Sequence, residues 1–330
     1  MLTIGTTERG HVMTGALACR ACVARWPIEG GVPNFVVRGG EAVVEQTTHG
    51  FARNWNRYSD VILANPALND DLFRDWIEPL QPESFAGNNV LEAGCGMGRW
   101  LAAAAPHAAA ALVGFDYSEV VHAAFRNTRH LKSVHVVRAD IFRMPFPRPG
   151  RGSTREPAFD VCYSIGVLHH TPDAARAFAC LLDVVRPRGV LSVWVYGKEH
   201  NEWIERVVTP LRVLLTSRLP DPVLLALSKA LTLQLVAAAR TYVCAFPTKT
   251  AFPYDAYTRH ILRYPRQYLE HVVYDHLVPQ LAQYFPRNEV ERWACDHGLA
   301  YVVTARNNNS WRLMAARAED ALRAFVAPAT

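Results

Sequence analysis

The hydrophobic and polar positions between residues 88 and 197 follow two alternating periods. Short apolar runs of strand length are each followed by a longer segment with helical spacing. The predicted strands are 90–93, 111–115, 134–137, 159–164 and 190–195, and the predicted helices are 99–105, 118–130 (capped by Ser118) and 173–185. This alternation predicts an α/β fold in which helices cover both faces of a parallel sheet. A ligand is then expected at the carboxyl ends of the strands.

The alternation stops after Gly197, where helical segments follow one another as far as about residue 281. A helix at 288–297 and strands at 300–304 and 310–315 then resume the earlier pattern. We therefore predict five parts, which are a small cysteine-bearing piece (1–45), a helical cover (46–84), the core (85–197), a helical lid (198–285) and the completion of the core (286–330).

One lid segment, residues 223–239, is apolar enough to suggest a membrane helix. Lys229 and Gln234 interrupt it, and it is shorter than the roughly 20 residues that span a bilayer. The sequence therefore favours a helix buried in the lid and no membrane span.

Composition narrows the class of protein only modestly. With 330 residues, of which 50% are hydrophobic and 20% charged, the chain can bury a large core. The formal charge of +5 comes mostly from isolated arginines, so nucleic acid is not an expected partner. Seven scattered cysteines form no disulfide framework, and the first residues do not resemble a secretory signal. We expect a cytoplasmic protein.

The strongest motif places Gly94, Gly96 and Gly98 directly after the first predicted core strand. Glycines here allow a sharp turn and let a ligand approach the main chain. A dinucleotide-binding loop would have its third glycine one position later, where this chain has Arg99, and this difference disfavours a nicotinamide cofactor. By itself the motif is equally typical of an ordinary strand-to-helix turn.

Two aspartates end the next two strands. Asp116 is spaced to accept hydrogen bonds from ribose hydroxyls, and Asp140 could accept a proton from an adenine amino group while Ile141 covers the ring. Each aspartate alone could be a cap or a turn residue. Three successive strand ends that agree with one another favour a nucleoside-type cofactor.

Residues 85–196 resemble class I S-adenosylmethionine-dependent methyltransferases, especially the group that includes ubiquinone and menaquinone biosynthesis enzymes. The resemblance implies a Rossmann-like, seven-stranded, mostly parallel sheet whose last strand, here 310–315, is antiparallel. It also implies that S-adenosyl-L-methionine is the cofactor. The cofactor site implied by the resemblance consists of Glu92 at the amino group, Gly94, Gly96 and Gly98 at the methionine part, Asp116 and Tyr117 at the ribose, Asp140 and Ile141 at the adenine, and Ser164 and Gly166 beside the methyl group.

Methyl transfer needs an aligned nucleophile and, for a hydroxyl acceptor, a base. His169 and His170 follow the fourth core strand and are candidates, although a structural or cofactor-lining role is also open. His276 in the lid is a third candidate that also suits simple packing. We expect a small or medium-sized acceptor methylated at oxygen or nitrogen. The alternatives are an RNA methyltransferase and a non-catalytic scaffold that binds the cofactor.

The first 45 residues resemble half of a zinc-ribbon-like domain that some methyltransferases carry. Cys19 and Cys22 form one cysteine pair, whereas zinc commonly needs four ligands, and His11 is the other nearby candidate. We expect a metal-free remnant, and a homodimer that shares two cysteine pairs is left open. Aromatic side chains on either side of the core are expected to cover the site: Trp55, Tyr58, Tyr254, Tyr257, Tyr264, Tyr268 and Tyr274, with Arg266 among them.

Overall fold

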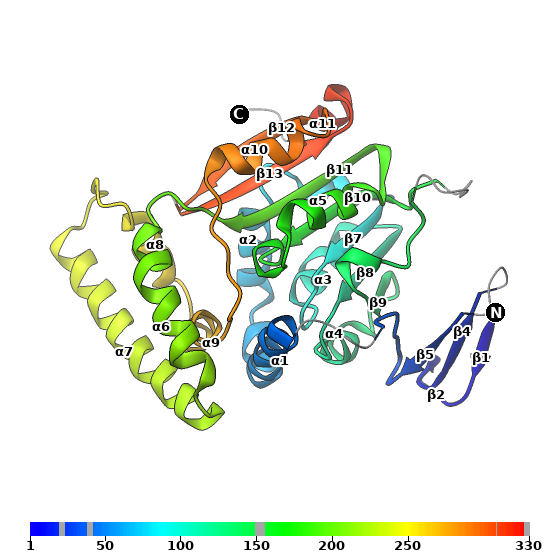
Figure 1. The fold of residues 1–330 in the computed structure, drawn as a ribbon, viewed down its shortest axis with the longest axis horizontal. Coiled ribbons are helices and arrows are strands. Elements are labelled where there is room, and N and C mark those ends of the chain that lie inside the picture. Colours follow the sequence, from blue (N-terminus) through cyan, green and yellow to red (C-terminus); the bar gives the residue numbers. More distant parts are fainter. Residues whose placement is uncertain (20–23, 38–41, 149–155, 308, 327–330) are drawn as a thin grey trace.

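A seven-stranded sheet forms the centre of the molecule (Figure 1). The computed structural model describes residues 1–19, 24–37, 42–148, 156–307 and 309–326. The strand order is β12-β13-β11-β10-β7-β8-β9. The strands are β7 (Asn89–Ala93), β8 (Ala111–Asp116), β9 (Val134–Arg138), β10 (Phe159–Ile165), β11 (Val185–Tyr196), β12 (Ala300–Arg306) and β13 (Ser310–Ala316). The last strand, β13, runs antiparallel to both of its neighbours, and the other core pairings are parallel. The predicted fold class is confirmed.

Successive residues of the strands face opposite helical layers, as the pleat of a strand requires. Val90 belongs to one hydrophobic core and Leu91 to the other, and both are fully buried. The first core includes residues of α2 (Pro66–Ile77), α3 (Arg99–Ala104), α4 (Val121–Thr128) and α11 (Glu319–Phe325), and the second includes α5 (Ala174–Leu182) and α10 (Arg287–Cys295). Continuous apolar strand sequences therefore result from burial on both faces.

Two local predictions are corrected by the structure. Ser118 does not cap a helix, because α4 begins only at Val121; its main-chain N–H and hydroxyl instead donate to Asp116. The helix predicted to reach residue 185 ends at Leu182, and β11 begins at Val185, earlier than predicted. The proline and glycine at 187 and 189 lie inside this strand, where the pairing with β10 is irregular, a site at which strands tolerate both residue types.

The N-terminal piece forms a four-stranded sheet and a two-stranded hairpin. The sheet contains β1 (Leu2–Ile4), β4 (Gly15–Ala18), β5 (Arg25–Glu29) and β6 (Val32–Pro33), and the hairpin contains β2 (Thr7–Glu8) and β3 (His11–Val12). Phe35 N–H donates to the carbonyl of Arg138, which joins this piece to β9. The ring of His11 packs edge-on against Phe125, with centroids 5.4 Å apart. Cys22 lies outside the described residues, among which no cluster of three metal-ligating side chains occurs.

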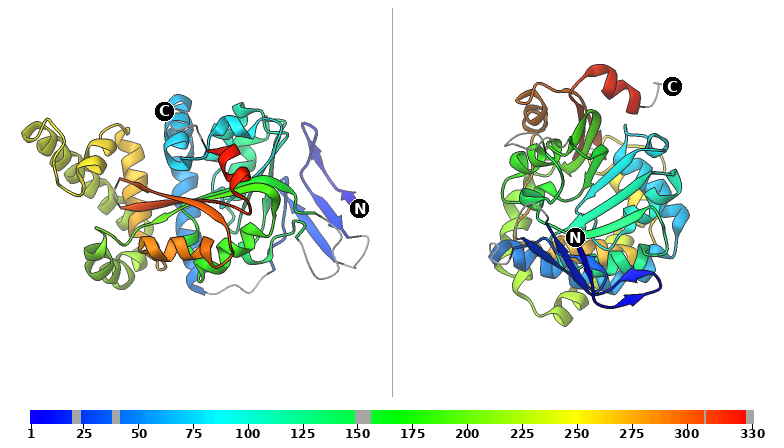
Figure 2. Two further views of the ribbon diagram at one scale, coloured as in Figure 1. Left: turned by 90° about the horizontal axis from the view of Figure 1, so that it is seen from above. Right: turned by 90° about the vertical axis from the view of Figure 1, so that its right-hand side faces the viewer.

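Helices cover the carboxyl ends of the parallel strands. They are α1 (Ala42–Leu63) from before the core and the lid elements η5 (Ile204–Val208, a π-helix), α6 (Thr209–Leu214), η6 (Thr216–Arg218), α7 (Asp221–Ala245), α8 (Asp255–Ile261) and α9 (Arg266–Leu277). α1 packs against α9, and α7 packs against the other side of α9. Both views in Figure 2 show the lid as a separate layer beyond the sheet, at the end opposite the N-terminal sheet.

The helix α7 differs from its prediction. It has 25 residues, so it is long and apolar enough to cross a membrane by length and composition, and only 22% of its most apolar window is buried. The prediction of a short buried helix is therefore wrong. The segment was bounded at its polar residues, but Lys229 and Gln234 both favour helix and both lie on its exposed side. Proline stops the helix only at Pro247.

Candidate cofactor and acceptor site

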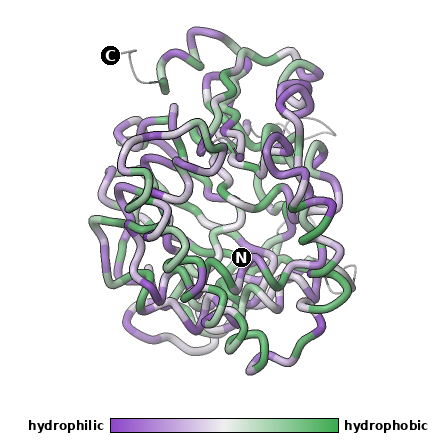
Figure 3. Tube along the Cα trace, turned by 90° about the vertical axis from the view of Figure 1, so that its left-hand side faces the viewer, coloured by the Kyte–Doolittle hydropathy of each residue, from purple (hydrophilic) through white to green (hydrophobic). Residues whose placement is uncertain are grey.

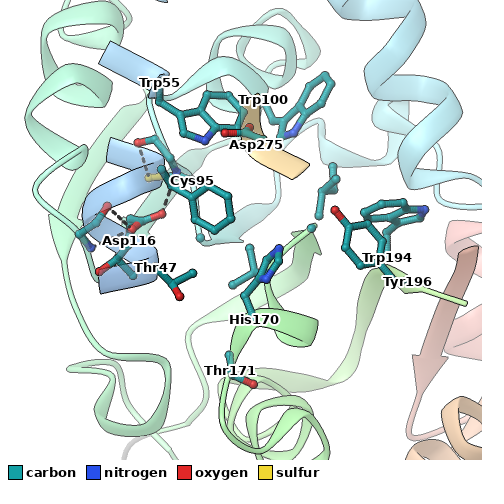
Figure 4. A pocket seen from close by; sticks show the side chains of 18 of the residues that line it. Thr47, Trp55, Cys95, Trp100, Asp116, His170, Thr171, Trp194, Tyr196 and Asp275 are labelled. Carbon is teal, nitrogen blue, oxygen red and sulfur yellow. Dashed lines mark hydrogen bonds between the residues drawn. The ribbon is translucent and has the colours of Figure 1, made fainter. Parts of the chain in front are cut away.

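A cavity of about 630 Å³ lies where the carboxyl ends of β7, β8, β9 and β10 meet α1 and the lid. Its volume falls within the range of about 300–1,000 Å³ that is typical of small-molecule sites. One end contains Gly96, Asp116 and Asp140, and the other is walled by aromatic side chains (Figure 4). The cavity therefore joins the predicted cofactor residues to the lid in one continuous space.

The glycine turn shapes the floor of this cavity. Gly94 has a φ of +76°, and a Cβ there would lie 2.2 Å from Cγ2 of Val167. The N–H groups of Gly94 and Cys95 both donate to the carbonyl of Phe115, at 2.8 and 2.9 Å, which closes the turn against β8. Gly96 has a φ of +53°, with nothing within 4 Å of an added Cβ. The main chain at Gly96 is thus open to a ligand.

Gly98 begins α3 and does not line the cavity. An added Cβ there would lie 3.1 Å from Cα of Ala124, so this glycine permits close packing of α3 against α4. Gly166 does line the cavity, where its nearest neighbour is the ring of Trp194. The two glycines therefore act on different sides of the turn, one in packing and the other at the ligand space.

Asp116 ends β8 and already accepts three hydrogen bonds. Its Oδ1 accepts from the main-chain N–H and the hydroxyl of Ser118, both at 2.8 Å, and its Oδ2 accepts from Gly96 N–H at 3.0 Å. A carboxylate offers about four lone-pair positions, so one remains, on Oδ2. Tyr117 lines the cavity beside it. The carboxylate both fixes the glycine turn and retains one position for a hydroxyl donor.

Asp140 and Ile141 also line the cavity. Oδ1 of Asp140 accepts from Phe142 N–H at 2.9 Å and so caps the short 3-10 helix η3 (Ile141–Arg143). Its Oδ2 takes no part in this cap. The cap and the predicted adenine contact can therefore coexist in one residue, because they use different oxygens.

Two of the predicted residues, Glu92 and Ser164, lie beneath the cavity and do not line it. Glu92 is 1% exposed and accepts from the hydroxyl of Tyr163 at 3.2 Å, and burial raises its pKa to about 8. The hydroxyl of Ser164 donates to the carbonyl of Ala93 at 2.9 Å, joining β10 to the end of β7. Their predicted contacts with the cofactor remain predictions.

The three candidate histidines have different surroundings. His169 is fully buried under Tyr196, with ring centroids 3.8 Å apart, and neither ring nitrogen has a hydrogen-bond partner. His170 lines the cavity, and its Nδ1 lies 2.7 Å from the carbonyl oxygen of Leu281. His276 also lines the cavity, with Nδ1 at 2.8 Å from the carbonyl oxygen of Val272. Burial lowers the pKa of all three, that of His170 to about 4.

A buried polar network that the sequence did not indicate joins α1 to α9. Nδ2 of Asn54 lies 2.8 Å from Nδ1 of His271 and donates to Oδ1 of Asp275 at 2.7 Å. Nε2 of His271 lies 3.3 Å from Oδ2 of Asp275. Burial raises the pKa of Asp275 to about 8, and both His271 and Asp275 line the cavity. The histidine and aspartate are one helical turn apart, which is the only signal in the sequence that could have paired them.

The far end of the cavity is mostly aromatic. Of the covering residues predicted from the sequence, Trp55, Tyr257, Tyr264 and Tyr268 line it, whereas Tyr58, Tyr254, Arg266 and Tyr274 do not. Rings that the sequence did not single out also line it: Phe51, Trp76, Trp100, Trp194, Tyr196 and Tyr284. Figure 4 shows Trp194 and Tyr196 facing Trp100 across the space. This wall suits a flat, mainly apolar molecule.

Comparison with known proteins assigns the chain to a family. A family model described as a methyltransferase domain matches residues 68–304, which is more than two thirds of the chain. The chain therefore belongs to this methyltransferase domain family. It is an S-adenosylmethionine-dependent methyltransferase domain of class I, and S-adenosylmethionine is the methyl donor that the family implies. No protein with a curated description matches it.

Solved structures of other methyltransferases also match. An S-adenosylmethionine-dependent methyltransferase from Mesorhizobium loti is 25% identical, with 34% of this chain and 48% of that chain covered and a TM-score of 0.30. This chain therefore spans about half of that protein. The YcgJ protein of Bacillus subtilis is 15% identical, covering 67% and 65%, with a TM-score of 0.40. A methyltransferase from Aquifex aeolicus is 15% identical, covering 76% and 97%, also with a TM-score of 0.40.

The residues present fit S-adenosylmethionine. The open main chain at Gly96 leaves room for a ligand against the turn, and Asp116 and Asp140 each keep a carboxylate position unused within the cavity. When bound, the cofactor supplies an electrophilic methyl group on a positively charged sulfur. Because methyl transfer is an in-line displacement, the contribution of the chain is to align the acceptor and exclude water.

Proposed function

We propose that this chain transfers a methyl group to an oxygen or nitrogen atom of a small or medium-sized metabolite with a flat, largely apolar body. The observation that carries the proposal is the single cavity that runs from Asp116 and Asp140 to the aromatic wall. A flat acceptor held against this wall lies in the same water-poor space as the cofactor residues. Alignment and exclusion of water are the two contributions that methyl transfer requires.

We infer that His170 accepts the proton of the acceptor. The carbonyl of Leu281 can only accept a hydrogen bond, so Nδ1 of His170 carries the ring proton and Nε2 keeps its lone pair. A pKa of about 4 makes His170 a weak base, but a weak base is sufficient here. An oxygen that gains a methyl group while still protonated becomes strongly acidic, so its proton passes readily to a neutral imidazole.

The direct test mixes purified protein with S-adenosylmethionine labelled in its methyl group and a small-molecule extract of the source cells. Mass spectrometry should then find the label in one compound or in a few related compounds. Label in the RNA of a parallel sample, and none in small molecules, would instead support an RNA methyltransferase. Cofactor binding without any label transfer would favour a scaffold that binds the cofactor but does not turn over.

A further inference from the structure

The lid exposes an unusual number of large hydrophobic side chains. Thirteen such side chains are exposed in the described part of the chain, and nine of them lie between residues 203 and 252. Five belong to η5, α6 and the residues beside them: Trp203, Val207, Leu211, Leu214 and Leu215, each at least 52% exposed. Figure 3 views the molecule from the side on which α6 and α7 lie in Figure 1. The exposure is therefore local to one arm of the lid.

Their spacing places the α6 side chains on one helical face. Positions 203, 207, 211 and 214 are separated by four, four and three residues, the spacing that aligns side chains along a helix. Arg206 and Arg218 are exposed on the same stretch, near its two ends. A helix with an apolar stripe, a tryptophan and flanking arginines has the composition of helices that lie in a membrane interface.

The helix α7 continues the pattern. Its outward positions 223, 226, 230, 233 and 237 are valine, alanine or leucine, and all are exposed. The side that faces the protein contains the buried residues Ser228 and Thr232, whose hydroxyls donate to carbonyls of their own helix. The outer side is thus at least as apolar as the inner side, the reverse of an ordinary surface helix.

The charges on this arm all have one sign. Between Trp203 and Lys249 the exposed charged residues are Arg206, Arg218, Lys229, Arg240 and Lys249. The acidic residues of the stretch are less exposed and are paired, Glu205 with Lys198 and Asp221 with Arg57. An apolar surface ringed only by positive charge is complementary to anionic lipid headgroups above acyl chains. A second copy of this chain would instead bring the same positive charges against it.

From these observations we propose that the arm formed by η5, α6 and α7 docks on the surface of an anionic lipid bilayer. The arm lies in the plane of the interface, with its apolar side chains inserted and its arginines and lysines at the headgroups. α7 does not cross the bilayer, because its inner side remains packed along α9. The proposal is independent of the methyl acceptor, since it concerns side chains that do not line the cavity.

The test is flotation of the full-length protein with lipid vesicles. We expect it to float with vesicles of phosphatidylcholine and phosphatidylglycerol, to bind phosphatidylcholine alone much more weakly, and to lose binding as salt concentration rises. The triple variant Val207→Ser/Leu211→Ser/Leu214→Ser should bind the anionic vesicles about tenfold or more weakly, because three inserted side chains are lost. Its affinity for S-adenosylmethionine and its melting temperature serve as folding checks and should stay unchanged.

The matched control is Leu2→Ser/Ile4→Ser, which removes two equally exposed apolar side chains from the N-terminal sheet. It should bind vesicles as the parent does. Equal loss in both variants, or no binding to anionic vesicles at low salt, would overturn the proposal. So would a dimer that the triple variant abolishes, which would identify a second copy as the occupant. Resistance of vesicle-bound protein to alkaline carbonate would also overturn it, by showing that α7 spans the bilayer.

Discussion

Nδ1 of His170 lies 2.7 Å from the main-chain oxygen of Leu281, so a residue at the end of a core strand is oriented by the segment that follows the lid. This contact determines which ring nitrogen carries the proton and leaves Nε2 to act as a base. It also links the base to the lid: a lid displaced from the core would leave the imidazole free to change tautomer.

Replacing His170 by Ala or Gln should lower kcat by about 10²-fold, the usual effect of losing a general base. Affinity for S-adenosylmethionine should stay within about threefold, because the proposed cofactor contacts lie elsewhere. Turnover of the parent should fall as the pH drops through about 4, where His170 becomes protonated. Calorimetric binding and steady-state rates check this, with the exposed His135→Ala as the control. Equal losses of affinity and kcat would assign His170 a lining role.

Replacing Asp116 by Asn should weaken S-adenosylmethionine binding by about tenfold or more. The change removes the charge from a hydrogen bond to the ribose that is worth about 1.5–3 kcal/mol, and it places an amide donor opposite Gly96 N–H. Isothermal titration measures the affinity, and thermal unfolding shows whether the turn is still folded. An unchanged affinity would remove the ribose site from Asp116.

Gly96 and Gly87 provide a matched pair for testing the turn. Both have positive φ, +53° and +72°, and an added Cβ meets nothing within 4 Å at either position, but only Gly96 lines the cavity. Each alanine variant should lose about 1–2 kcal/mol of unfolding free energy from the backbone conformation. Only Gly96→Ala should also lose cofactor affinity, measured by titration. Cofactor affinity that is the same in both variants would contradict the open approach at Gly96.

Glu92 predicts a proton linked to cofactor binding. With a pKa of about 8 raised by burial, it is about nine-tenths protonated at pH 7. If it supports the amino group of the cofactor, the carboxyl must ionise, and binding should release nearly one proton. Titrations in two buffers of different ionisation enthalpy measure this release. Glu92→Gln should bind more weakly and release none from this position; equal release in parent and variant would contradict the contact.

The same group affects stability without cofactor. Because its pKa is higher in the folded chain than its ordinary 4.5, the folded state holds more protons between pH 4.5 and 8. The stability that this carboxyl contributes is present below about pH 4.5 and is lost as the pH rises through 8. Denaturant unfolding should therefore show Glu92→Gln gaining stability relative to the parent between pH 5 and pH 9, as order-of-magnitude bounds of that window. A constant difference would show that Glu92 is ionised when folded.

The alternation of strands and helices, the glycine turn and the aspartates at strand ends were all predictable from the sequence. Each depends on residues a few positions apart, since strand period, turn conformation and capping are local properties. The antiparallel last strand and the seven-stranded sheet followed from the resemblance. The limits of the method appear where a residue can satisfy two local roles, as with Ser118, whose partner is Asp116 and not the helix after it.

Tertiary structure alone decided which distant residues share the cavity. Asn54 meets His271 across 217 positions, and His170 meets Leu281 across 111, because α1 and the lid pack over the strand ends. No period in the sequence encodes such pairs. The exposure of α7 is of the same kind: its composition indicated burial, but α9 covers only one of its sides. Local sequence therefore determined the elements and their chemistry, and packing decided which side chains face the ligand, the core and the surface.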